Sequence, residues 1–296
     1  MILKDYSQIC IANIMQFQKD LQKTGSSPEG VNLIRHAILS GIKMYRKQFR
    51  SYGELVICCD GGNYWRKESF PHYKACRKTM REASTLDWGL IFSTMDELRE
   101  DLKEHFPYKV LRADRAEADD IIATMCLYTQ TNALKDYGMF EEKQPVMIVS
   151  GDFDFKQLHK FDNVSQWSPI KKKKVTSEDP ARDLLTKILT GDTSDGIMNI
   201  CSRDDIFVTE GRQVPFRKNR IDDFIRLGRD ACKDDIERHG WDRNVKLIDF
   251  TQIPDDIQKS IISQYEAYIV KGDKMKIFEY LVSKKCRLLL NDLDEF

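Results

Sequence analysis

The chain lacks the motifs that mark several common enzyme classes. It contains no G-x-S-x-G, no P-loop and no G-x-G-x-x-G, so serine hydrolases, P-loop nucleotidases and dinucleotide-binding enzymes would miss their key residues. Its five histidines form no H-E-x-x-H pattern, and its eight cysteines include no C-x-x-C pair. Zinc binding through these residues is therefore not indicated.

Long apolar runs are missing as well. No stretch approaches the ~20 apolar residues that a membrane-spanning helix needs, and no signal peptide is expected at the start. The composition, with 41% hydrophobic and 32% charged residues, is typical of a globular protein. Because the cysteines are scattered, we expect a reducing, cytoplasmic location and no membrane partner.

The chain also carries no net charge, since 47 basic residues balance 47 acidic ones. Taken alone, this balance argues against nucleic acid as a ligand. Nine of the acids, however, belong to the set described next, and without them the chain has an excess of nine basic residues. The distribution of charge therefore matters more than its sum.

What the chain does contain is a set of carboxylates at predicted strand ends and helix starts. The apolar runs LVICCD (55–60) and VMIVSGD (146–152) end in acids, and a short run leads to Asp5. Like charges at short range repel, and hard divalent cations are the usual counter-charge for oxygen ligands. The full set is Asp5, Asp60, Glu117, Asp119, Asp120, Asp152, Asp154, Asp192 and Asp195.

Two Mg²⁺ or Mn²⁺ ions would meet this requirement, because ions about 3.5–4 Å apart activate water and stabilise charge on a phosphate. Each group of acids also has a simpler explanation. Residues 117–120 could cap a helix, residues 152–154 could form a polar loop, and residues 192–195 could form a turn. The coincidence of all nine at element ends is what indicates a metal site.

Strands and helices alternate in the first part of the chain, which predicts an α/β fold with a mainly parallel sheet and helices on both faces. Weaker strands are expected at 109–111 and 164–168, and helices at 31–46, 87–106 and 119–127. Sites in such sheets form beyond the carboxyl ends of the strands, where these acids lie. After residue 200 we expect a mainly helical part, with helices in 221–238 and 254–284 and an unpartnered strand-like run at 245–250.

A basic and aromatic segment follows Asp60. Basic groups neutralise phosphates, and aromatic rings stack on unpaired bases at ~1–3 kcal/mol per base. The spacing predicts that Lys74, Arg77, Lys78 and Arg81 share one helix face, with a solvated amphipathic face as the alternative. The candidates for nucleic-acid contact in this segment are Tyr64, Arg66, Lys67, Tyr73, Lys78 and Arg81.

Two further basic stretches are less specific. The run RQVPFRKNR (212–220), with Arg217 and Lys218, could contact a duplex backbone or could be a solvated loop. Four consecutive lysines, 171–174, are more typical of a solvated hairpin than of a phosphate contact.

In their order along the chain, these motifs resemble the 5′-nuclease (flap endonuclease) superfamily, and most closely its ribonuclease H branch from T-even-type bacteriophages. The similarity covers nearly the whole chain. The matching segments are DYSQIC, CCDGGNYWRK, HYKACRKTMREAS, EADDIIA, SGDFDFKQLHKFDNVSQWSP, KILTGDTSDGI, IDFTQIPDDI and the terminal DEF.

The resemblance implies a metal-dependent 5′→3′ exonuclease and flap endonuclease that removes RNA primers during lagging-strand synthesis. It would act on RNA–DNA hybrids and on duplex DNA with a nick or a 5′ flap. The first ion would be held by Asp60, Glu117 and Asp119, with Asp5 acting through water. The second would be held by Asp152, Asp154, Asp192 and Asp195, and Asp120 would contribute to either.

The resemblance also implies an architecture and partners. Lys74 and Arg77, in a Y-K-x-x-R pattern, would clamp the scissile phosphate in a helical arch at about residues 64–100. The nuclease core would span 1–200, and a DNA-binding part 201–296. We expect a monomer in the host cytoplasm, with a replication single-strand binding protein and a sliding clamp as candidate partners.

Two departures from the family pattern stand out. The strand before Asp5 is short and carries Lys4 where an apolar residue is expected. A glycine-rich helix–hairpin–helix, which binds duplex backbone around a monovalent ion, should follow Asp195, but GIMNICSRDD contains one glycine. The basic stretch 212–220 is the candidate to replace it.

Two other functions remain open. A phosphatase of the haloacid-dehalogenase type is suggested by GDTSD, but it needs an Asp-x-Asp after the first strand, and this chain has Asp5-Tyr6-Ser7. A branched-DNA binding protein without catalysis would have lost metal ligands, yet none of the expected acids is missing.

Overall fold

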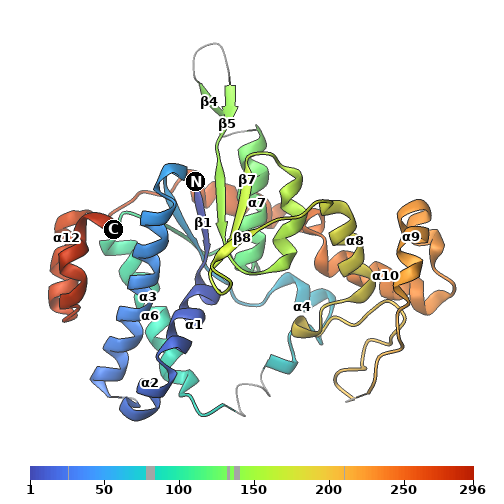
Figure 1. Ribbon diagram of the computed structural model, residues 1–296, viewed down its shortest axis with the longest axis horizontal. Coiled ribbons are helices and arrows are strands. Elements are labelled where there is room, and N and C mark those ends of the chain that lie inside the picture. The colour runs from blue at the N-terminus through green and yellow to red at the C-terminus, as the bar shows by residue number, and fades with distance from the viewer. Residues whose placement is uncertain (26, 78–83, 132–133, 137–140, 210) are drawn as a thin grey trace.

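A six-stranded sheet forms the centre of the molecule (Figure 1). The computed structural model describes residues 1–296 except 26, 78–83, 132–133, 137–140 and 210. The strand order is β3-β2-β1-β6-β7-β8, with all neighbours parallel except β7 and β8. The strands of this sheet are β1 (Ile2–Asp5), β2 (Leu55–Cys58), β3 (Lys109–Leu111), β6 (Val146–Val149), β7 (Val164–Ser168) and β8 (Lys173–Val175). The predicted mainly parallel α/β sheet is confirmed.

The central strands are short and buried on both faces, which is why they read as continuous apolar runs. Lys4 is the exception in β1, and it is fully buried there. Its ammonium donates a hydrogen bond of 2.9 Å to the carbonyl of Gly41 and lies 4.9 Å from the centre of the Tyr45 ring. The short first strand is thus the middle of the sheet, paired with β2 and β6.

One face of the sheet is covered by N-terminal helices and by the end of the chain. Ile38, Leu98 and Leu281 come from three of these elements and meet in one buried cluster. Ser27 caps the longest helix and Pro28 occupies its first turn, a common start signal. The elements are α1 (Tyr6–Gln16), α2 (Gln18–Thr24), α3 (Pro28–Gln48), α6 (Trp88–His105), α12 (Lys274–Ser283) and the 3₁₀ segments η1 (Arg50–Tyr52) and η7 (Arg287–Glu295).

The opposite face packs against a second cluster that includes Ile122, Phe155 and Ile257. These residues come from α7 (Ala118–Thr131), η2 (Phe153–Lys160) and α11 (Asp255–Glu266). The sheet therefore has helices on both faces, as predicted. A separate two-stranded ribbon joins β4 (Leu134–Asp136) to β5 (Glu141–Lys143).

A third group of helices extends from the edge of the sheet near β8 (Figure 1). It contains α4 (Trp65–Ser69), α8 (Pro180–Thr190), η3 (Thr193–Asp195), η4 (Lys218–Arg220), α9 (Ile221–Leu227), η5 (Gly228–Ala231), α10 (Asp235–Ile248) and η6 (Phe250–Gln252). The predicted strand-like run at 245–250 is wrong, because residues 245–248 close α10. Leu247 and Ile248 continue the buried helical stripe of Gly240, Arg243 and Asn244.

The predicted arch needs a partial correction. Residues 78–83 lie outside the described part of the chain, but α6 packs in the core through Ile91, Met95 and Leu98, so residues 88–100 are not part of an arch. The division at residue 200 stays a prediction. Among the described helices, none has the length and apolarity needed to cross a bilayer.

Candidate active site

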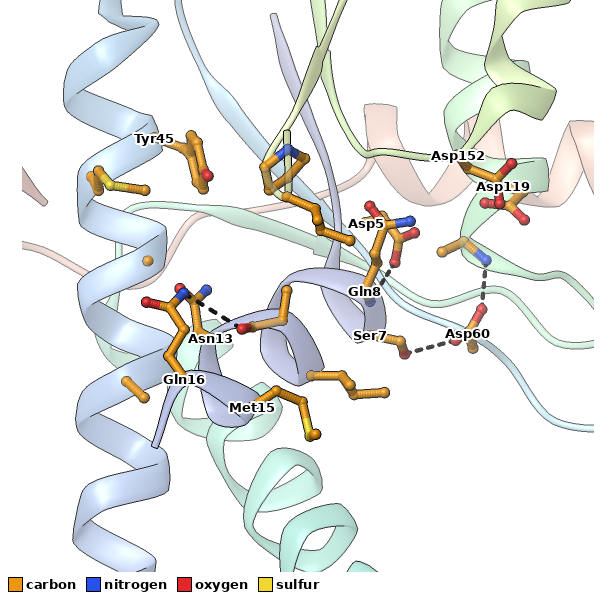
Figure 2. A pocket seen from close by; sticks show the side chains of 18 of the residues that line it. Asp5, Ser7, Gln8, Asn13, Met15, Gln16, Tyr45, Asp60, Asp119 and Asp152 are labelled. Carbon is orange, nitrogen blue, oxygen red and sulfur yellow. Dashed lines mark hydrogen bonds between the residues drawn. The ribbon is translucent and has the colours of Figure 1, made fainter. Parts of the chain in front are cut away.

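A cavity of about 970 Å³ lies beyond the carboxyl ends of β1, β2 and β6. Carboxylates from three strand ends and from the start of α7 line one part of it, and α1 and α3 line another. Figure 2 shows Asp5, Asp60, Asp119 and Asp152 gathered on one side, with α3 and Tyr45 across from them. The sheet thus brings together acids that are more than 140 residues apart in the sequence.

Four carboxylates that line the cavity form a first group: Asp5, Asp60, Asp119 and Asp152. Asp5 caps α1, accepting from the backbone N–H of Gln8 at 3.0 Å. Asp60 accepts from the Ser7 hydroxyl at 2.7 Å, and from a backbone N–H at the start of α7. No lysine or arginine of the described residues forms an ion pair with these four carboxylates. We call them the unpaired carboxylates.

Two of these carboxylates, Asp5 and Asp119, have raised pKa values. Burial, and then the nearby charge of Asp60, raise the pKa of Asp5 to about 7. Burial also raises the pKa of Asp119 well above its usual range, with Asp152 and Asp5 adding to the effect. A divalent cation placed among these groups would remove that penalty.

Glu117 has the opposite environment. It is 2% exposed and accepts from Arg66 and Tyr73 at 2.9 Å each and from the Lys74 ammonium at 2.6 Å. Burial alone would raise the pKa of Glu117, but Lys74 and Arg66 outweigh it and hold the value below its usual range.

Asp195 lies beside Glu117 and shares two of its partners, Tyr73 and Lys74. Arg77 donates to it at 2.6 Å, the Tyr73 hydroxyl at 3.2 Å, and the Lys74 ammonium lies 3.4 Å away. The backbone N–H of Lys74 also donates to the Asp195 carbonyl at 2.7 Å. The segment around Lys74 is therefore bound to both carboxylates at once.

Asp154 and Asp192 share the ammonium of Lys187, from α8. Lys187 contacts Asp154 directly and lies 2.9 Å from Asp192. Burial raises the pKa of Asp154 to about 7 despite Lys187, whereas Lys187 and Ser194 keep the pKa of Asp192 below its usual range against the opposing effect of burial. Together with Glu117 and Asp195, these two residues form what we call the paired carboxylates.

Comparison with known proteins gives matches along the whole chain. Residues 14–185 match the family described as 5′-3′ exonuclease, N-terminal resolvase-like domain. Residues 178–296 match the family described as T4 RNase H, C terminal. The ribonuclease H of Enterobacteria phage T4 is 34% identical over 305 residues, covering 99% of this chain and 95% of that protein. The chain belongs to the 5′-3′ exonuclease family.

The chain is also similar to a flap endonuclease over part of its length, and to two solved structures in fold. The flap endonuclease Xni of Shewanella sp. strain MR-4 is 33% identical over 114 residues, which is 38% of this chain and 36% of that protein. The 5′-exonuclease of bacteriophage T5 with bound zinc has a TM-score of 0.58, with 16% identity over 91% of this chain and 99% of that one. A complex of the T5 flap endonuclease with DNA and metal ions gives 0.59, with 16% identity over 90% and 98%. These structures share the fold.

The donor set of the 5′-nuclease fits divalent metal ions. All the donors are carboxylate oxygens, which suits Mg²⁺ and Mn²⁺. Among the described residues, no three His, Cys, Asp or Glu side chains converge closely enough to enclose an ion by themselves. Mg²⁺ is commonly bound by one or two carboxylates with water and phosphate oxygens, so a complete protein cage is not needed.

Asp120 does not belong to this set, and its prediction as a metal ligand is corrected. The carboxylate is fully buried and accepts from the Trp65 indole at 3.1 Å and from the Glu117 backbone N–H at 2.9 Å, while Arg66 lies 2.8 Å away. It caps the start of α7 from the inside and is absent from the cavity wall.

Two predicted nucleic-acid contacts are also wrong. Arg66 is 2% exposed and is saturated by Glu117, Asp120 and a backbone carbonyl, so its guanidinium has no access to a strand. Tyr73 is 3% exposed and points its hydroxyl at Glu117, so its ring cannot stack on a base.

The prediction that Lys74, Arg77, Lys78 and Arg81 share one helix face is wrong for Lys74. Lys74 has a φ of +57°, which is not helical, and this turn is what directs its ammonium back to Glu117. Lys74, Arg77 and Tyr64 all line the cavity. Lys67, Arg217 and Lys218 are exposed and are not among the residues that line it, and Lys78 and Arg81 lie outside the described residues.

Two features of this site were not predicted from the sequence. One is the neutral wall of the cavity, formed by Asn13 and Gln16 of α1 with His36 and Ser40 of α3. The buried residues of α1 follow helical spacing, which could have revealed the helix but not its place at the cavity. The other is Lys187. In the sequence it is one lysine of a helical pattern, and only the fold shows that it pairs with Asp154 and Asp192.

Proposed function

We propose that this 5′-nuclease is a divalent-metal-dependent 5′→3′ exonuclease and flap endonuclease. It hydrolyses phosphodiesters in RNA–DNA and DNA duplexes next to a nick or a 5′ flap, using two Mg²⁺ or Mn²⁺ ions. The proposed role is removal of RNA primers from the lagging strand.

The observation that carries this proposal is the mixed lining of one cavity. Unpaired carboxylates and two basic side chains, Lys74 and Arg77, face the same space. Carboxylates alone would repel a phosphodiester, and cations alone would bind it without chemistry. Both together suit a metal-assisted reaction on a phosphate.

The roles of individual residues follow from their contacts. Asp5, Asp60, Asp119 and Asp152 would hold metal ions at the strand ends, with the paired carboxylates completing the set. Lys74 and Arg77 would bind the phosphate and stabilise the charge that develops on it. When bound, the metal ions would supply Lewis-acid activation of water and of the phosphate.

The relatives support the substrate class. A structure of the T5 flap endonuclease contains DNA and metal ions, and the phage T4 relative is a ribonuclease H. As further parts of the proposal, the protein acts as a monomer in the host cytoplasm, with a replication single-strand binding protein and a sliding clamp as partners.

A cleavage assay tests this function. Wild type with Mg²⁺ should cut a labelled 5′-flap DNA and a nicked RNA–DNA duplex, and Asp152→Asn should lower the rate by at least about hundredfold, as expected for a group that supports charge stabilisation at the reaction centre. Asp162→Asn is the matched control, because Asp162 is an exposed carboxylate outside the cavity wall.

The alternatives give different outcomes. Binding of the flap by wild type without cleavage would contradict the nuclease and favour a branched-DNA binding protein. Turnover of para-nitrophenyl phosphate, unaffected by Asp152→Asn, would instead favour a phosphatase. Equal rates for Asp152→Asn and wild type on the flap would remove Asp152 from the proposed site.

A further inference from the structure

The hairpin of β7 and β8 borders the cavity and carries four consecutive lysines. Ser168 pairs with Lys173, so residues 169–172 form the connecting loop. The lysines at 171–174 are all exposed, which confirms the predicted solvated hairpin. Solvation is not its whole role, however, because Pro169, Ile170 and Lys172 also line the cavity.

An exposed aromatic ring lies next to this hairpin. Phe153 stands between two predicted metal ligands, Asp152 and Asp154, and is 49% exposed. The Lys171 ammonium lies 4.5 Å from the ring centre, and the Lys156 ammonium lies 5.2 Å from it. A single exposed apolar residue is common, but this one is flanked by cations and directly follows Asp152, which lines the cavity.

The hairpin lysines are free for an external anion. Lys156 is paired with Asp183 at 3.1 Å, whereas none of the lysines at 171–174 forms an ion pair within the described residues. An aromatic face together with unpaired ammonium groups matches the two parts of a single-stranded nucleic acid, its bases and its phosphates.

We propose that Phe153, Lys171 and Lys172 form a binding surface for an unpaired strand of the substrate. Phe153 stacks on a nucleobase, and the two lysines bind neighbouring phosphates. In a duplex the bases are stacked inside, so Phe153 serves only unpaired nucleotides. The assignment of this strand to a nuclease substrate rests on the proposed function, while the binding surface itself does not.

The test is binding to a single-stranded oligonucleotide that contains 2-aminopurine, measured in a chelator so that no cleavage occurs. Wild type should quench the fluorescence by stacking. Phe153→Leu should lose the quenching and bind about tenfold more weakly, within the range for loss of one base stack. Its affinity for a blunt duplex should be unchanged. Phe278→Leu is the control, since Phe278 on α12 is 46% exposed and remote in sequence.

A second pair of variants leaves the carboxylates untouched. Lys172 has a φ of +49°, so Lys172→Asn keeps a residue that tolerates this conformation, and Lys171→Gln keeps the length of the side chain. Each should lower the dependence of log affinity on log salt for the single strand by about 0.7. Lys259→Gln, at an exposed lysine of α11, should leave the slope unchanged.

The outcomes separate this proposal from the proposed function. Undiminished quenching by Phe153→Leu, or an equal loss of affinity for single strand and blunt duplex, overturns the stacking surface. Phe153-dependent quenching by a wild type that cleaves nothing supports the surface and overturns the nuclease. Normal cleavage by wild type, with no effect of Phe153→Leu on binding, supports the nuclease and overturns the stacking surface.

Discussion

The unpaired and the paired carboxylates lie side by side at one edge of the sheet, yet among the described residues only the paired group contacts basic side chains. Among the described residues, no lysine or arginine pairs with Asp5 or Asp119, and burial raises the pKa of both. Glu117 is more fully buried than either, but it is surrounded by Arg66, Tyr73 and Lys74, and its pKa is lowered. The fold therefore neutralises part of its acidic site with its own side chains and leaves the rest to an external cation.

The two groups of carboxylates should therefore differ in how they bind a metal ion, although their sequence motifs look alike. A divalent ion at the unpaired carboxylates relieves repulsion and should stabilise the fold. An ion at Asp154 and Asp192 must compete with the ammonium of Lys187. Metal binding is thus expected to be strong at one side of the site and weaker at the other.

The largest expected effect comes from Asp119→Asn. Cleavage should fall by at least about hundredfold, because a charged metal ligand is lost. Without divalent ions the same variant should be more stable than wild type by about 1–2 kcal/mol, since a repelled, buried charge is removed. Thermal unfolding in a chelator measures this. Asp192→Asn should instead lower the free energy of unfolding, because Lys187 loses a partner. If both variants shift this free energy in the same direction, the unpaired and paired carboxylates do not differ as described.

Next in size is Arg66→Met. Arg66 joins Glu117 to Asp120, and removing one member of a buried ion pair costs about 3–5 kcal/mol. Urea denaturation measures the loss. Arg238→Met is the control, because its partner Asp235 is 98% exposed and such surface pairs contribute at most about 1 kcal/mol. A cost near that of the control would mean that Arg66 is not needed to hold the paired carboxylates.

A pH series sharpens the comparison further. The pKa of Asp5 is about 7 in the fold, above its ordinary value of 3.8, so the folded state keeps this proton where the unfolded state has lost it. Between pH 4 and 7 the folded state then binds more protons, and rising pH lowers the free energy of unfolding, by about 1–4 kcal/mol for this group. Wild type in a chelator should show this decline relative to Asp5→Asn. Parallel profiles for the two proteins would contradict it.

The smallest expected effect is that of Lys187→Met on metal affinity. Removing the ammonium should tighten Mn²⁺ binding at Asp154 and Asp192 by about tenfold, as for loss of one nearby like charge at the edge of the protein. Electron paramagnetic resonance of Mn²⁺ without substrate measures this. Lys259→Met should have no effect. Weaker Mn²⁺ binding by Lys187→Met would show that the ammonium supports the site instead of competing for it.

Much of this site could be predicted from the sequence because its signals are local. A short apolar run followed by an acid, as before Asp60 and Asp152, marks the carboxyl end of a buried parallel strand. The sheet then brings those ends together, whatever fills the sequence between them. The family resemblance agrees with this placement.

The partners of the acids could not be predicted, because each is chosen by the tertiary fold. Lys187 reaches Asp154 across 33 residues of sequence, and Lys74 reaches Glu117 only through a positive φ that helical spacing did not reveal. Arg66 and Tyr73 are residue types that are common on nucleic-acid-binding surfaces, but in this fold both are buried and donate hydrogen bonds to Glu117. The run 245–250 looked like a strand because six residues are too few to show helical spacing. Its buried residues continue the buried face of α10, which begins earlier in the chain.

The buried bond from Lys4 to Gly41 has a consequence for how the cavity can adapt. Lys4 immediately precedes Asp5, while Gly41 lies in the α3 wall that faces the carboxylates. Moving α3 outward would leave the buried Lys4 amine, whose pKa burial lowers to about 7, without its hydrogen-bond acceptor, and an unpaired buried polar group costs about 1–3 kcal/mol. The hydrogen bond from Lys4 to Gly41 therefore fixes the distance between α3 and the carboxylates. Variants that admit bulkier substrates should arise by trimming side chains on α3, not by displacement of the helix.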